Sequence, residues 1–145
     1  MCFLPGTKTK TNKMGIERDY LMRQLMMLFE VIHKILRLRR KGDKEEAEKE
    51  IKYFYGCLKI EDDIQNLGIE KFVDILVSEK KLTNEHIEMI AFVMKEQGEL
   101  AKTEKERLNF FHKAYFLLNK VEQESISFSM DRQMKLAELK QYLPE

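Results

Sequence analysis

The sequence contains few residues that break helices or cross-link a chain. Among its 145 residues are six glycines, two prolines, two cysteines and no tryptophan. This composition disfavours a fold of many short strands and favours long helices. Two cysteines, Cys2 and Cys57, make no disulfide framework, and a chain of this length can bury enough surface to fold without one. We therefore expect both thiols to be reduced, as in the cytoplasm.

Long apolar runs are also missing. No stretch of about 18 apolar residues predicts a membrane span. The opening residues, MCFLPGTKTKTNK, lack the apolar core of a secretory signal. We predict that residues 1–13 are a disordered N-terminal extension, or a product of start-site choice. Residues 14–145 are predicted to form a single all-helical domain that is cytoplasmic and makes no membrane contact.

Motifs for catalysis, metal binding and cofactor binding are missing as well. His33, His86 and His112 do not have the spacing of paired zinc ligands. The glycines are too scattered for a phosphate-binding loop, and no serine lies in a G-x-S-x-G motif. We predict no catalytic, cofactor-binding or metal-binding residues, no cofactor and no enzyme activity. Carboxylates brought together only by the fold would leave no such signal.

Apolar residues at helical spacing are abundant, most of all in residues 16–41. One stripe steps by four, three, four and three residues through Leu21, Leu25, Leu28, Ile32 and Ile35. A second, adjacent stripe contains Met22, Met26, Phe29 and Leu36. A helix that is apolar on two faces is normally buried between neighbours. We expect this helix to be the central helix of the domain or part of a dimer interface.

The stretch RRKGDKEEAEKEI, residues 39–51, predicts a joint between two helices. Arginine and lysine at its start favour the negative end of a helix dipole. Gly42 suits the left-handed conformation that ends a helix. Asp43 is then a good N-cap, with Glu46 three residues later as in a capping box. Such a short turn makes the two helices antiparallel.

The rest of the chain predicts further helices and no strand. A short helical turn is expected at 61–67 and a helix at 69–79. Helices are also expected after Thr83 or Asn84, after Thr103 with Glu106, and after Ser127 or Ser129. Gly98 allows close packing near the end of its helix. In the last helix the inward residues are expected to be Met130, Met134, Leu136, Ala137, Leu139 and Leu143. The fold class is therefore all-α, with about six helices in antiparallel hairpins.

The segment GDKEEAEKEI, residues 42–51, resembles the second-helix start of a tetratricopeptide repeat, with Ala47 followed four residues later by Ile51. The match ends there, because Val31 stands where the repeat has tryptophan. A second segment, residues 94–118, resembles the repeat at Gly98, Ala114 and Leu118, but its spacing is about four residues too long. The first sixty or so residues are also similar to small uncharacterised bacterial all-helical proteins. The resemblance to tetratricopeptide repeats implies a right-handed array of helical hairpins with a concave binding face. The alternative is an irregular helical bundle.

Charge is unevenly distributed along the chain. Residues 1–41 hold ten basic and three acidic residues, a net of +7, and the remainder has a net of −6. Two functions follow as hypotheses. The first is a non-catalytic interaction module that binds a protein, a peptide or another copy of itself. The second, less favoured, is a small nucleic-acid-associated regulator that uses the basic end of the first helix. The candidate partner-binding residues are Met22, Met26, Arg37, Arg39, Arg40 and Lys41.

Overall fold

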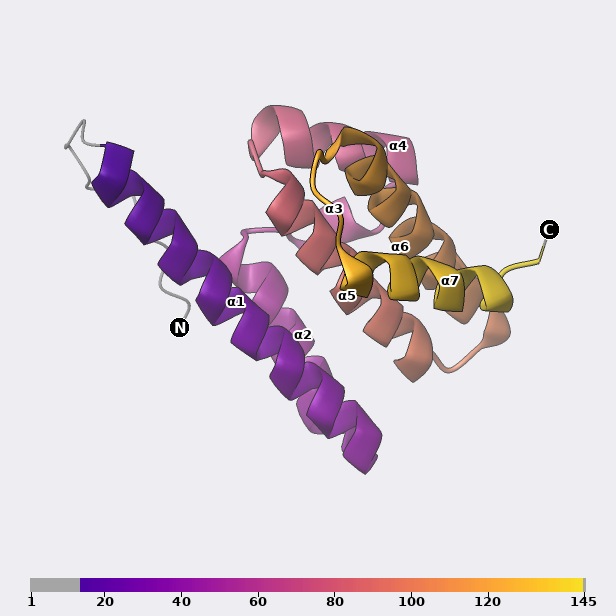
Figure 1. Ribbon diagram of the computed structural model, residues 1–145. Helices are drawn as coiled ribbons and strands as arrows, with labels where there is room; N and C mark the ends of the chain where they lie inside the picture. The colour runs from indigo at the N-terminus through magenta and orange to yellow at the C-terminus, as the bar shows by residue number, and fades with distance from the viewer. Residues whose placement is uncertain (1–13, 145) are drawn as a thin grey trace. The chain divides into compact units, whose positions relative to one another are not determined.

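The computed structural model describes residues 14–144, with side chains from residue 18 onward. The fold is all-α, as predicted, and the described residues contain no strand (Figure 1). Contacts divide the chain after Asp62 into two compact units, which are considered one at a time. The predicted extension, residues 1–13, lies outside the described residues, and the single domain stays a prediction.

The first unit is a hairpin of two helices, α1 (Met14–Lys41) and α2 (Lys44–Cys57), which pack side by side (Figure 1). Gly42 has a φ of +83°, the left-handed conformation expected at this joint. The backbone N–H of Asp43 donates to the carbonyl of Leu38 at 2.9 Å. The Asp43 carboxylate accepts from the N–H of Glu46 at 3.4 Å. The predicted end of the first helix, the turn at Gly42 and the start of the second helix after Asp43 are therefore confirmed.

Only part of α1 is buried. Its buried residues are Leu28, Val31, Ile32 and Ile35, whereas Leu21, Met22, Met26 and Phe29 are exposed. The interpretation of a helix buried on two faces is therefore wrong for the N-terminal half. The cause is length, because α1 has 28 residues and α2 has 14. A partner of half the length can cover about half of a helix. The other interpretation, an interface with a second molecule, stays a prediction.

Cys57 lies at the end of α2 and is completely buried. It is disulfide-bonded, so the prediction of a reduced thiol is wrong at this position. Separation along the sequence does not decide which thiols meet in space, because a disulfide depends on the distance and orientation of the two residues. The second cysteine of the sequence, Cys2, lies outside the described residues.

The second unit is built around one central helix, α6 (Glu104–Glu124), which contacts α4 (Ile69–Asp74), α5 (Asn84–Leu100) and α7 (Met130–Tyr142). In Figure 1, α7 runs across the α5–α6 pair. A single helical turn, α3 (Asp62–Gln65), precedes them. The helix expected at 69–79 is present, but its second half is the π-helical turn η1 (Ile75–Glu79). Apolar spacing does not distinguish a short π-turn from an α-helix.

Side-chain caps begin three of these helices. Thr83 accepts from the N–H of His86, and Thr103 accepts from the N–H of Glu106 at 3.1 Å. Ser129 accepts from a backbone N–H at the start of α7. The cap predicted at Thr103 is confirmed. Of the alternatives left open by the sequence, the structure selects Thr83 and Ser129.

Gly98 permits the close approach of α5 and α6 that the sequence predicted. A Cβ at this position would lie 2.4 Å from Cε1 of Phe111, far inside van der Waals contact. The Phe111 ring is completely buried and stacks on Tyr142 of α7, with centroids 5.1 Å apart. The ring therefore has little room to move aside. The contact between the two helices depends on the missing side chain.

The last helix, α7, buries fewer residues than its pattern predicted. Leu139 is completely buried, but Met130 and Met134 are each 63% exposed. Their prediction as inward residues is therefore wrong. Helix α7 packs on α5 and α6 through the face that carries Arg132 and Leu139. Apolar spacing identifies a helix face but does not show whether anything covers it.

Candidate functional site

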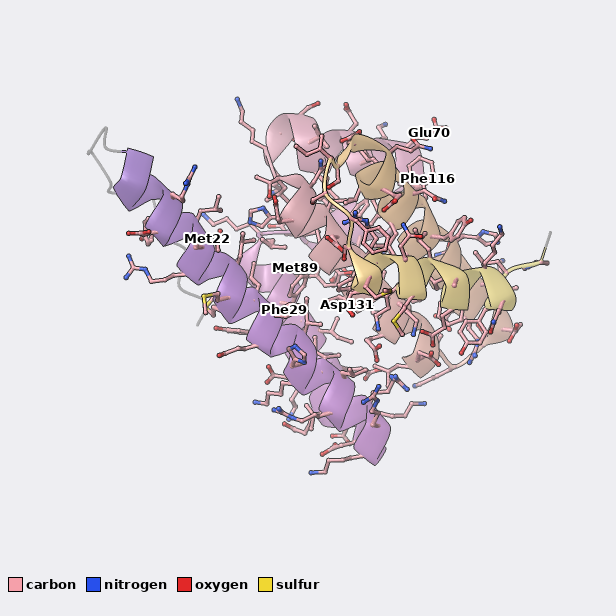
Figure 2. The ribbon with its side chains drawn as sticks, in the orientation of Figure 1. Met22, Phe29, Glu70, Met89, Phe116 and Asp131 are labelled. Atoms are coloured by element: carbon pink, nitrogen blue, oxygen red, sulfur yellow. The ribbon has the colours of Figure 1, made fainter. Side chains whose placement is uncertain are left out.

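The N-terminal half of α1 carries the predicted partner-binding methionines. Together with two neighbours they form a surface that we call the α1 stripe. Its members are Leu21, Met22, Met26 and Phe29, which are 37%, 51%, 63% and 40% exposed. Met22, Met26 and Phe29 are separated by four and three residues, so they share one face of the helix. Met22 and Phe29 are labelled on α1 in Figure 2.

The predicted basic residues lie at the other end of α1. Arg37, Arg40 and Lys41 are exposed, whereas Arg39 is partly buried and has an interaction partner. Met26 and Lys41 are separated by about 22 Å along the axis at 1.5 Å per residue. The structure therefore divides the predicted site into two surfaces, one apolar and one basic.

A groove lies between α1 and α2 in the first unit. Its volume is about 570 Å³, and its lining includes Met27, Val31, Lys34, Arg37 and Glu50. Lys34 and Glu50 form an ion pair across it at 3.2 Å. Charges of both signs line the groove. This arrangement favours a solvated contact between the helices over a ligand site.

Arg132 is the main polar tie of the second unit. Its side chain is 3% exposed and donates to Glu122 at 2.6 Å, to Glu88 at 3.5 Å and to the carbonyl of Ser127 at 2.8 Å. Burial raises the pKa of Glu88, and the positive charge of Arg132 opposes that rise. One arginine thus links α5, α6 and the loop before α7.

A second buried cation, Lys95, links α5 to α7. It is 3% exposed and pairs with Glu138 at 3.1 Å and with Glu99 at 3.4 Å. Among the described residues, no buried side-chain nitrogen or oxygen lacks a hydrogen-bond partner. Buried charges that are all paired are typical of structural ties. Neither cation could be predicted to be buried, because Glu138 and Glu88, their partners on other helices, lie 43 and 44 residues away and leave no local signal.

The histidines do not form a site. His86 sits at the third position of α5, where its Nδ1 accepts from the backbone N–H of Thr83 at 3.2 Å. Burial lowers the pKa of His86, although nearby Glu85 acts in the opposite direction. His33 and His112 are exposed on separate helices. Within residues 18–144, no group of three or more His, Cys, Asp or Glu side chains is placed to hold a metal ion.

A second exposed apolar surface surrounds the start of α7. It consists of Ile126, Phe128, Met130 and Met134, which are 105%, 70%, 63% and 63% exposed. The first two lie in the loop between α6 and α7. This surface was not predicted. The signal that could have indicated it is the alternation of serine with apolar residues in SISFSM, residues 125–130, which does not have helical spacing.

Comparisons with family models, with curated proteins and with solved structures find no match for this chain. The tetratricopeptide-like resemblance therefore stays a prediction. Across the described part of the chain, every helix is too short or too polar to cross a bilayer.

Proposed function

We propose that the protein is a non-catalytic helical interaction module that binds a protein partner through the α1 stripe. One observation carries the proposal: the stripe is apolar and regular, and the described part of the first unit leaves it exposed. Amphipathic helices normally turn such a face toward a core. Contiguous exposed apolar patches mark interaction surfaces. The straight row of side chains suits a partner helix lying alongside α1.

Methionine suits this use. Its unbranched thioether side chain adapts to irregular partner surfaces. Covering an exposed methionine or phenylalanine is worth roughly 1.5–3 kcal/mol when burial is complete. Since tenfold in affinity corresponds to about 1.4 kcal/mol, two or three such residues can determine whether a complex forms.

The test compares two exposed methionines of equal exposure, Met26 on α1 and Met134 on α7. The purified protein is used to capture partners from nuclease-treated lysate of the native host, and each captured protein is then purified and titrated against three forms of the chain. Met26→Asp should weaken binding at least tenfold, because it buries a carboxylate in the complex. Met134→Asp should bind as the unmodified chain does. Sedimentation of the chain alone tests self-association in the same three forms.

Two results would contradict the proposal. If Met26→Asp loses its helical circular dichroism, Met26 is a core residue and not a contact residue. If both variants retain full binding, the partner uses another surface.

The alternative function, nucleic-acid association, relies on the basic residues at the end of α1, of which Arg37, Arg40 and Lys41 are exposed. Binding of this kind should fall steeply with salt, since each neutralised phosphate releases counterions. Proteins that are captured from untreated lysate but not from nuclease-treated lysate would favour this alternative.

A cytoplasmic setting also stays a prediction. The disulfide at Cys57 weighs against it and favours an oxidising compartment, because disulfides are rare in the cytoplasm. Thiol labelling of the protein in fractionated host cells would decide between the two.

A further inference from the structure

The second unit contains a cavity that neither the α1 stripe nor the buried ion pairs use. Its volume is about 430 Å³, within the range of small-molecule sites. One wall is a face of α6 that carries Asn109, His112, Lys113 and Phe116; the other is the segment 66–69 that leads into α4. Both walls belong to the same compact unit. Figure 2 labels Phe116, at the α6 wall.

Lys113 is the only lysine or arginine in the cavity lining, which contains no Asp or Glu. Its Nζ donates one hydrogen bond to the backbone carbonyl of Gln65 at 3.1 Å, which holds the segment before α4 against α6. An ammonium group has three N–H donors, so this bond uses one of them. Partial burial lowers the pKa of Lys113, and no carboxylate lines the cavity. The described ion pairs leave this lysine without a carboxylate partner.

Apart from Gly68 and the imidazole of His112, the rest of the lining is divided between amide and apolar groups. Asn66 and Asn109 offer amide donors, while Leu67, Ile69 and Phe116 offer apolar contact. No arginine is present, and α4 has only six residues. A phosphate group, which is best held by arginine or by a long helix N-terminus, therefore fits less well than a singly charged carboxylate.

From this lining we infer that the cavity binds a small monocarboxylate with an apolar body. The carboxylate accepts from the Lys113 ammonium and from the asparagine amides, and the apolar body lies against Phe116 and Ile69. The site is separate from the α1 stripe, so either proposal can fail without the other.

Benzoate is a suitable probe, with benzamide as its neutral analogue and inorganic phosphate as a second anion. Each is titrated into the full chain and followed by amide chemical shifts in nuclear magnetic resonance spectra. Benzoate should give saturable shifts in residues 66–69 and around Lys113, with benzamide and phosphate at least tenfold weaker. If benzamide bound as tightly as benzoate, the negative charge of the carboxylate would play no part in binding. If phosphate bound as tightly as benzoate, contact with the apolar side chains would play no part in binding.

Substitutions test whether Lys113 supplies the positive charge that binds the carboxylate. Lys113→Met should weaken benzoate binding at least tenfold, whereas Lys105→Met, on an exposed part of the same helix, should not. Lys113→Met also removes the bond to Gln65, so Asn109→Asp provides a second test. This exposed substitution keeps that bond and places a carboxylate at the cavity, and it too should weaken benzoate at least tenfold. Unchanged benzoate binding in Asn109→Asp, or shifts that never saturate in the unmodified chain, would overturn the inference.

Discussion

The two units hold their helices together by different means. In the described part of the first unit every buried side chain is apolar, apart from the phenol of Tyr55. Its ion pairs, such as Lys34 with Glu50, lie at the surface. In the second unit Arg132 and Lys95 are buried and paired across helices. Apart from the disulfide at Cys57, the described part of the first unit therefore depends on apolar contact, while the second unit adds buried charge pairing.

This difference bears on which surfaces are available to partners. A buried cation selects neighbours that can supply carboxylates, and removing one partner leaves an uncompensated charge. Apolar faces accept any well-shaped apolar neighbour. The exposed α1 stripe is an apolar face of this second kind. We expect changes in the second unit to lower its stability and changes in the α1 stripe to lower partner affinity.

The largest expected effect on stability follows loss of Arg132. Arg132→Met removes the bonds to Glu88, Glu122 and Ser127 at once. We expect a loss of about 3 kcal/mol in the free energy of unfolding, the low end for a broken buried pair, because both glutamates keep some contact with water. Urea denaturation measures the loss, and hydrogen exchange should rise in peptides from α5 and α7.

The matched control is Lys34→Met in the first unit. Lys34 is 53% exposed in its pair with Glu50, and exposed pairs contribute at most about 1 kcal/mol. If the two substitutions cost the same, the contrast between the units is wrong.

A smaller loss of stability is expected when a methyl group is added at Gly98. Gly98→Ala places a Cβ 2.4 Å from the buried Phe111 ring. Overpacking costs about 1–3 kcal/mol, and the gain in helix propensity offsets about 0.5–1 kcal/mol of it. We expect a net loss of about 1–2 kcal/mol, measured as a lower urea midpoint. Gly56→Ala is the control in α2, where nothing lies within 4 Å of the added group. Gly56→Ala should raise the free energy of unfolding slightly. If both substitutions raised it, α5 and α6 could move apart at no cost in stability.

The sequence predicted the parts of the fold that depend on nearby residues. The joint at Gly42 and Asp43 and the cap at Thr103 were correct, because each cap bonds a backbone group within three residues. The contact permitted by Gly98 was also anticipated. Helix ends depend on residues within a few positions along the chain, so they can be predicted without knowing which other helices pack nearby.

Burial could not be predicted with the same accuracy. Met130 and Met134 have helical spacing, yet the second unit leaves each of them 63% exposed. Arginine is mostly found at protein surfaces, but Arg132 is buried because its partners come from α5 and α6. For the candidate site, the sequence identified exposed methionines on α1, but it grouped them with arginines at the far end of the helix. It gave no signal for the cavity at Lys113, whose walls meet only in the folded chain.

The smallest expected effect is a pH dependence located at the start of α5. Neutral His86 accepts from the N–H of Thr83, and burial lowers its pKa below the usual value near 6.5. The unfolded chain then binds this proton more readily, so the stabilisation is complete above about pH 6.5 and is lost as pH falls toward the lowered pKa. We expect a loss of less than about 1 kcal/mol between about pH 7.5 and pH 5.5. His86→Gln keeps a side chain that can complete the capping box but cannot titrate. The difference between the two unfolding curves isolates His86 from Glu88, whose raised pKa acts in the opposite sense. An equal pH dependence in both proteins would assign the effect to other groups.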